Sequence, residues 1–293
     1  MSEDPFVTHR GLLFTVAYEM LGSAAEAEDV VQETWIRWDA IGARARDEVR
    51  DPRAFLVRMV TRKALDRLRA NARRREEYVG EWLPEPLLTA PDVADDVALA
   101  ESVSFAVLTV LETLTPVERA VFVLREVFDL PYAEIAEAVD KSVPAVRQIG
   151  HRARDHVAAR RPRMEVHRSE QQVVVERFLA AVTGGDLQGL LDALAPDVVL
   201  VADGGGIAQA TLSPVLGAKK VANLLRTFPK FGAGARIVPV TLNGSPGAKI
   251  VDVADGYDTA ISLVVEAGRI ARIYAVRNPA KLQGIETEAV LSR

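Results

Sequence analysis

Residues 132–157 read YAEIAEAVDKSVPAVRQIGHRARDHV, which predicts two helices joined by a tight turn at Asp140-Lys141. In both segments, 132–139 and 142–157, apolar residues recur three and four positions apart. The inward-facing residues of the second segment are Val146, Ile149, Ala153 and Val157. The pattern therefore predicts a helix-turn-helix, whose second helix is the one that enters a DNA groove.

The opposite face of that second helix is polar and basic. It carries Ser142, Ala145, Arg147, Gln148, His151, Arg152 and Arg154. Arginine can bind guanine or phosphate, and glutamine can pair with adenine, so we expect this face to contact DNA. The alternative is an amphipathic helix whose polar face is merely solvated.

Charge is segregated along the chain although the net charge is only −5. Residues 53–75 are basic with Asp66 as the one acidic residue, and residues 141–163 are basic with Asp155 as the one acidic residue. Between them, every charged residue from 76 to 101 is acidic. Two basic blocks held apart by an acidic connector predict two phosphate-contacting surfaces on separate modules.

The composition limits the classes of protein. The 293 residues suffice for two or three domains, and no run of about twenty apolar residues predicts a membrane span. The N-terminus is acidic and does not resemble a signal peptide, and there is no cysteine. The histidines are scattered and no nucleotide-binding glycine loop occurs. We therefore expect a cytoplasmic protein without metal or cofactor.

The N-terminal part, residues 6–78, is predicted to be helical. Gly22-Ser23 interrupts the apolar pattern, and Ser23 with Glu26 has the spacing of a capping box at the start of a new helix. Gly42 ends that helix and Asp51-Pro52 opens the next. A linker with prolines and acidic residues follows, and its sequence WLPEP at 82–86 would dock on a neighbour.

Helices are predicted again over 101–160, and the pattern changes near residue 168. There we expect helices over 169–183, 186–194 and 219–228, and strands over 198–202, 236–242, 249–253, 259–266 and 269–276. Asn243-Gly244 and Ala267-Gly268 are the turn signals between strands. Helices followed by an antiparallel sheet give an α+β order.

Three segments resemble the extracytoplasmic-function (ECF) sigma factors of bacterial RNA polymerase. Residues 27–35, AEDVVQETW, are similar to the polymerase-binding helix of sigma region two, and residues 55–69 to the promoter-melting helix. Residues 115–157 resemble sigma region four. Phe55 and Arg62 depart from the tryptophan and asparagine that many members have there.

The remainder resembles one group of these factors, which carries a C-terminal SnoaL-like cone. Trp82-Leu83-Pro84-Glu85-Pro86 matches the linker motif of that group and Asp203-Gly204-Gly205-Gly206 matches its glycine motif. Asn278-Pro279-Ala280-Lys281-Leu282 matches the C-terminal motif except at Ala280, where an aspartate is usual.

The resemblance implies roles for particular residues. Polymerase binding, on the clamp helices of a large subunit, would fall to Asp29, Gln32, Glu33 and Trp35. The melted promoter strand would be held by Arg44, Arg46, Arg58, Arg62, Lys63, Arg67 and Arg69. Regulatory interdomain contacts would come from Trp82, Leu83, Pro84, Asp203, Gly204, Gly205, Gly206, Asn278, Pro279, Lys281 and Leu282.

The expected organisation is two all-α sigma modules and an α+β cone. The ranges are region two at 1–78, linker at 79–103, region four at 104–163, cone at 168–282 and tail at 283–293. The partners would be core polymerase, including its flap, and promoter DNA, and the free protein would be a monomer. In the group, shortening the tail activates and removing the whole extension inactivates, and we expect both effects here.

Two other functions are weighed against this one. SnoaL-like cones also host isomerases and cyclases, and the candidate general bases would be Asp203, Asp252, Asp255 and Asp258. No histidine lies within the cone, since His167 precedes it. The chain would otherwise be a DNA-binding regulator that senses a small ligand in the cone. The promoter sequence, the inducing signal, a separate anti-sigma protein and the domain placement are not readable.

Overall fold

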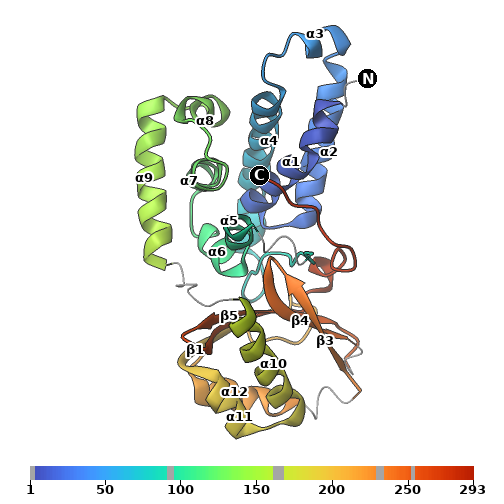
Figure 1. Ribbon diagram of the computed structural model, residues 1–293, viewed down its shortest axis with the longest axis vertical. Coiled ribbons are helices and arrows are strands. Elements are labelled where there is room, and N and C mark those ends of the chain that lie inside the picture. The colour runs from blue at the N-terminus through green and yellow to red at the C-terminus, as the bar shows by residue number, and fades with distance from the viewer. Residues whose placement is uncertain (1–3, 91–95, 161–167, 229–233, 252–254) are drawn as a thin grey trace.

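The computed structural model describes residues 4–90, 96–160, 168–228, 234–251 and 255–293. A helical part and a cone-shaped part that contains the sheet lie end to end, and both chain termini lie on the helical part (Figure 1). The last residues therefore return from the cone to the helices from which the chain started.

The first module is made of four helices. They are α1 (Pro5–Leu21), α2 (Ala24–Ala40), α3 (Ala43–Asp47) and α4 (Pro52–Glu76). Helix α1 ends at Gly22, whose φ of 67° is the left-handed conformation that glycine adopts without strain. Helices α1, α2 and α4 pack on one another around residues such as Trp38, which is 1% exposed. The predicted breaks at Gly22-Ser23, Gly42 and Pro52 are confirmed.

The start of α2 is capped by two different residues. The Ser23 hydroxyl accepts the backbone N–H of Glu26 at 3.1 Å, as predicted. The Glu26 carboxylate, however, accepts from the Asn71 amide at 2.7 Å. The backbone N–H groups of Ala24 and Ala25 donate to Glu85 of the linker instead. Only the first half of the predicted capping box is formed, because Asn71 engages the Glu26 carboxylate, and the distant Glu85 caps the next two N–H groups.

The second module contains the helix-turn-helix. Its helices are α5 (Val97–Ser102), α6 (Phe105–Leu111), α7 (Pro116–Phe122), a π-helical turn η2 (Val123–Val127), α8 (Tyr132–Val139) and α9 (Val143–Arg160). Thr115 and Glu118 form a complete capping box on α7. The helical segment predicted from residue 101 is interrupted near its start, because α5 ends at Ser102 and Ser104 caps α6.

The helix-turn-helix is folded as predicted. Asp140 ends α8 with a φ of 54°, so the chain reverses there within a few residues. Val146, Ala153 and Val157 of α9 are buried, and Ile149 is half-buried. The two helical modules share one continuous apolar core, which includes Leu13 of α1, Leu56 of α4 and Val121 of α7. This shared core holds the modules against each other.

The cone begins with α10 (Arg168–Gly184) and α11 (Leu187–Ala193). Its sheet has the strand order β2-β1-β6-β5-β4-β3, in which β1 and β6 are parallel and the other pairs are antiparallel. The strands are β1 (Leu194–Asp203), β2 (Val215–Leu216), β3 (Arg236–Leu242), β4 (Ser245–Val251), β5 (Thr259–Glu266) and β6 (Arg269–Val276), and α12 (Ala218–Leu225) lies between β2 and β3. Asn243 and Ala267 have positive φ in the predicted turns.

The helices α10, α11 and α12 cover one face of this sheet (Figure 1). Phe178 of α10, Leu190 of α11 and Val221 of α12 form a core with β1, β5 and β6. β1 begins four residues before the predicted 198, and the two-residue strand β2 was not predicted, because so short an edge strand has no readable alternation. The helix predicted over 219–228 is α12 and ends at Leu225.

The linker and the tail tie the cone to the helices. Leu88 pairs with Leu242 of β3, and Thr89 pairs with Ala289 of the tail, as isolated β-bridges. Farther along the tail, the Ser292 backbone N–H donates to the Thr15 hydroxyl of α1 at 3.1 Å. The final residues therefore contact the first helix.

Candidate functional site

The face of α2 predicted to bind polymerase points away from the core. Asp29, Gln32 and Trp35 are exposed and Glu33 is half-buried, whereas Val30 and Val31 are buried. Trp35 is 46% exposed, an unusual setting for so large an apolar side chain. The sequence analysis assigned polymerase binding to these four residues, and the structure leaves three of them exposed.

The acidic residues of this face are paired with α4. Glu33 accepts from Lys63 at 2.7 Å and from Arg67 at 3.1 Å, and Asp29 lies 3.6 Å from Arg67. The hydrogen bond from Lys63, with the charges of Lys63 and Arg67, lowers the pKa of Glu33. Lys63 and Arg67, which were predicted to hold DNA, therefore contact α2, the helix predicted to bind polymerase.

Two other arginines of α4 face the helix-turn-helix. Arg58 donates to the Glu137 carboxylate at 2.7 Å, and Arg62 donates to the Glu137 backbone carbonyl at 2.8 Å. The Arg58 guanidinium also lies over the Phe55 ring, 5.3 Å from its centre. In this arrangement Arg58 and Arg62, which were predicted to hold the melted strand, contact Glu137 of α8. Arg69, farther along α4, pairs with Asp66 at 3.2 Å.

The arginines around α3 differ from each other. The Arg44 side chain is 98% exposed, with Glu48 3.9 Å away. Arg46 lies over the Trp38 ring and donates to Asp4 at 3.4 Å. Arg44 is accordingly accessible, whereas Arg46 fastens the N-terminus to α2.

The recognition helix α9 presents its polar residues outward as predicted. Ser142, Arg147, Gln148, His151, Arg152 and Arg154 are exposed, and Ala145 is half-buried. Arg154 is held by the Glu126 carboxylate at 2.6 and 3.1 Å, and this ion pair raises its pKa. Arg147 lies over the Tyr132 ring. His151 lies 2.9 Å from Asp155 within the same helix.

Asp203, at the end of β1, is the centre of a second cluster. It is fully buried, and its carboxylate accepts from the Leu83 backbone N–H at 2.9 Å and from Lys281 at 2.7 Å. The Tyr78 hydroxyl donates to the other carboxylate oxygen. One aspartate thus connects the linker motif, the glycine motif and the C-terminal motif, which lie far apart in the sequence.

Lys281 completes this cluster. Its ammonium donates to the Leu83 carbonyl at 2.6 Å and lies 3.2 Å from the centre of the Trp82 ring, the geometry of a cation–π contact. Asn278 donates to the Tyr78 hydroxyl at 2.8 Å. Tyr78 was not among the predicted residues; it lies at the end of the predicted first module and carries no motif of its own. Burial raises the pKa of Tyr78, so it remains a hydrogen-bond donor.

The glycine motif fits closely against these residues. Gly205 and Gly206 have φ of 60° and 71°, and a Cβ on Gly205 would collide with the Asn278 side chain. Pro279 begins the short helix η3 (Pro279–Lys281), and Leu282 packs between two apolar clusters at this junction. Ala280, where an aspartate was noted as usual, is exposed and donates its backbone N–H to Asn278.

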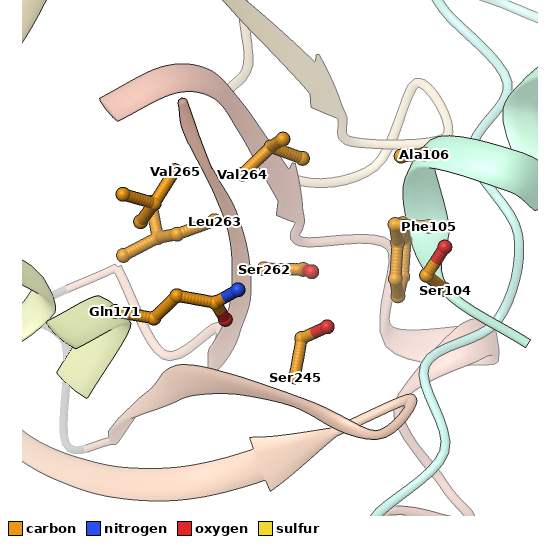
Figure 2. A pocket seen from close by; sticks show the side chains of 9 residues that line it. All are labelled: Ser104, Phe105, Ala106, Gln171, Ser245, Ser262, Leu263, Val264 and Val265. Atoms are coloured by element: carbon orange, nitrogen blue, oxygen red, sulfur yellow. The ribbon is translucent and has the colours of Figure 1, made fainter. Parts of the chain in front are cut away.

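An apolar seam continues this junction toward the second module. Leu83 and Phe105 pack against Val264 and Tyr274 of the sheet. Figure 2 shows the small cavity in this seam, where α6 meets β5 and the side chains of Ser245, Ser262 and Gln171 gather. The cavity is therefore part of the contact between modules and does not lie deep in the cone.

Three candidate general bases of the cone lie in the described part of the chain, and each has a basic side chain within 4 Å. Asp203 accepts the hydrogen bonds described above, and Asp255 is paired with Arg277 at 2.7 Å. Asp258 lies 3.9 Å from Lys249. Asp252 and His167 lie outside the described residues. Within the described ranges, no group of three or more metal-ligating side chains comes together.

Residues 6–74 match the family Sigma-70 region 2, and residues 104–157 match Sigma-70, region 4. The chain is 36% identical over 297 residues to the ECF RNA polymerase sigma factor SigJ of Mycobacterium tuberculosis, an alignment that covers 97% of this chain and 94% of that protein. The crystal structure of SigJ is similar with a TM-score of 0.78 at 35% identity, covering 96% of this chain and 98% of that one. This chain belongs to the ECF sigma factors.

A second protein of M. tuberculosis, the probable ECF sigma factor SigI, is 33% identical over 284 residues, covering 96% of this chain and 94% of that protein. The predicted fold class is confirmed: two all-α sigma modules precede an α+β cone. The sigma factor therefore binds RNA polymerase and acts in transcription initiation. Membership in this family implies a regulator of transcription that works together with RNA polymerase. In the described part of the chain, no helix has both the length and the hydropathy needed to cross a membrane.

Proposed function

We propose that this sigma factor is regulated by its own cone, which fixes how the two sigma modules lie relative to each other. The buried cluster around Asp203 carries this proposal, because it joins the linker between the modules to the C-terminal ends of the adjacent cone strands β1 and β6. Buried hydrogen-bonded charges tolerate little displacement, so the linker has a defined path. A domain added only for solubility would not need such a contact.

The division into working parts follows from this proposal. Residues 1–78 would bind polymerase and melt the promoter, 79–103 would connect, and 104–163 would bind upstream DNA. Residues 168–282 would regulate the two sigma modules, and residues 283–293 would form the C-terminal tail. Helix α2, through Asp29, Gln32, Glu33 and Trp35, would contact the clamp helices of the polymerase, and region four would contact the flap.

The free sigma factor would be a closed, monomeric state. The contacts from Arg58 and Arg62 to Glu137 occupy arginines that the melted promoter strand would need. Polymerase holds the two modules at separate sites, so binding would separate α4 from α8. The exposed arginines of α9 would then bind upstream DNA through phosphate and base contacts.

The test is in vitro transcription with core polymerase from a promoter that the factor recognises. The full chain is compared at equal concentration with residues 1–282, residues 1–166 and the full-length variant Asp203→Asn. We expect higher output from 1–282, and lower output from 1–166 and from Asp203→Asn. Equal output from all four proteins would contradict regulation by the cone.

A further inference from the structure

The hairpin turn between β3 and β4 reaches the helical part of the molecule. Asn243 and Gly244 both have positive φ, 52° and 72°, as the Asn-Gly turn of a two-residue hairpin requires. A Cβ on Gly244 would lie 2.9 Å from the Ala100 Cα, so the turn is pressed against α5. The sequence identifies the turn but not what it touches.

The Asn243 side chain makes hydrogen bonds to three parts of the sigma factor. Its amide donates to the Tyr18 hydroxyl of α1 at 2.7 Å and to the Val103 carbonyl between α5 and α6 at 2.8 Å. Its carbonyl accepts the Leu87 N–H of the linker at 2.9 Å. Asn243 is completely buried. Asn243 therefore makes hydrogen bonds to the first helical module, to the second helical module between α5 and α6, and to the linker at Leu87.

Tyr18 extends this contact. Its hydroxyl accepts from Asn243 and donates to the Glu85 backbone carbonyl at 2.7 Å. Tyr18 is fully buried, and burial raises its pKa, so the hydroxyl keeps the proton that it donates. The Tyr18 ring is fixed by stacking on Phe14. The hydroxyl is thus a rigid connection between the hairpin turn and the linker.

Glu85 carries the contact to the polymerase-binding helix. Its carboxylate accepts the Ser23 hydroxyl at 2.6 Å and the first free N–H groups of α2, those of Ala24 at 2.7 Å and Ala25 at 3.1 Å. A carboxylate at a helix N-terminus satisfies orphan donors and complements the helix dipole. Glu85 therefore sets where α2 begins and which way it points.

We propose that Asn243, Tyr18 and Glu85 are positioning residues for polymerase binding. They form a hydrogen-bonded relay from the cone hairpin to the N-terminus of α2, and none of them belongs to the surface that would touch polymerase. The relay holds α2 in its binding orientation before polymerase arrives, which lowers the ordering cost of association. This inference rests on the proposed function, in which α2 is the polymerase-binding surface and the cone regulates it.

The test uses the full-length sigma factor, and the measured quantity is the Kd for core polymerase. Asn243→Gly keeps the left-handed backbone and removes the amide, while Tyr18→Phe keeps the ring and removes the hydroxyl. We expect each variant to weaken binding by about three- to tenfold, the effect of losing one or two buried hydrogen bonds. Because both lie on one relay, the double variant should bind about as weakly as the weaker single variant.

Thr89→Val is the matched control. The Thr89 hydroxyl is buried and accepts the Gly244 N–H at 3.0 Å, so this substitution removes a hydrogen bond from the same turn. It leaves Tyr18 and Glu85 untouched. We expect thermal stability to fall as in Asn243→Gly, with an unchanged Kd for polymerase.

The double charge reversal Asp29→Lys/Glu33→Lys separates the two proposals. If it abolishes binding while Asn243→Gly and Tyr18→Phe bind like wild type, the relay is wrong and the polymerase surface stands. If it leaves binding intact, the proposed surface itself is wrong. Additive effects of the two relay variants, or an equal loss in Thr89→Val, would also overturn the relay, since both outcomes describe general loosening.

Discussion

The ammonium group of Lys281 lies 2.7 Å from a carboxylate oxygen of Asp203, and the two side chains are 4% and 0% exposed. Removing one partner of a buried ion pair leaves an uncompensated charge, which costs about 3–5 kcal/mol. We therefore expect Lys281→Met to lower the free energy of unfolding of the full chain by that order, measured by chemical denaturation. Lys281→Met/Asp203→Asn should recover part of the loss, because no buried charge then lacks a partner. A double variant less stable than both single variants would contradict this.

The Arg58–Glu137 contact should limit access of single-stranded DNA to α4. Glu137→Ala removes the carboxylate and frees Arg58, so we expect tighter binding of a single-stranded oligonucleotide by the free sigma factor, measured by fluorescence anisotropy. Glu134→Ala is the control, because Glu134 lies on α8 and lines the same pocket as Arg58 and Glu137. Equal affinity of the Glu137 variant and wild type would show that the closed arrangement does not restrict DNA.

The two arginines Arg152 and Arg154 should differ in their contribution to DNA binding. Both arginines are exposed on α9, but Arg154 is held by the Glu126 carboxylate. We expect Arg152→Ala to reduce the dependence of log affinity on log salt by about one for promoter DNA bound to the polymerase complex, as for one lost phosphate contact. Arg154→Ala should change this slope less. The reverse order would show that Glu126 releases Arg154 in the complex.

Glu19 should make the stability of the sigma factor depend on pH. It is completely buried in α1, accepts the Ser102 hydroxyl at 2.7 Å, and burial raises its pKa to about 8. The unfolded chain loses this proton near its ordinary pKa, 4.5, and the folded chain keeps it up to about 8. The unfolded state therefore binds fewer protons in this interval, and stability falls with rising pH by at most about 1.4 kcal/mol per unit.

Glu19→Gln removes this dependence, so we expect the variant to gain stability relative to wild type as pH rises from 5 to 8, measured by urea denaturation. The neighbouring charged groups do not obscure the comparison. Burial lowers the pKa of Arg119 to about 9, which lies above the interval, and the pKa of Glu85, which is also raised, is common to both proteins. A constant difference between the two proteins across this range would contradict the prediction.

Much of the fold was predictable because its signals are local. The apolar spacing of 142–157, the Thr115–Glu118 capping box and the Asn243-Gly244 turn each depend on residues within a few positions of one another. The division of α5 from α6 and the strand β2 escaped prediction. Ser104 caps α6 and so separates it from α5, although apolar residues flank this position in the sequence. Strand β2 has two residues, which are too few to show an alternating pattern.

For the site, the sequence by itself determined which motifs exist and which family they belong to, since the exposed face of α2 and the basic face of α9 follow from helical periodicity. Only the tertiary structure decided which residues meet. Tyr18 and Asn243 are 225 positions apart, and Tyr78 and Asp203 are 125 apart. Such contacts arise when packed helices and sheet bring buried polar groups together, and each group must then find a partner. That requirement selects residues which no local pattern distinguishes.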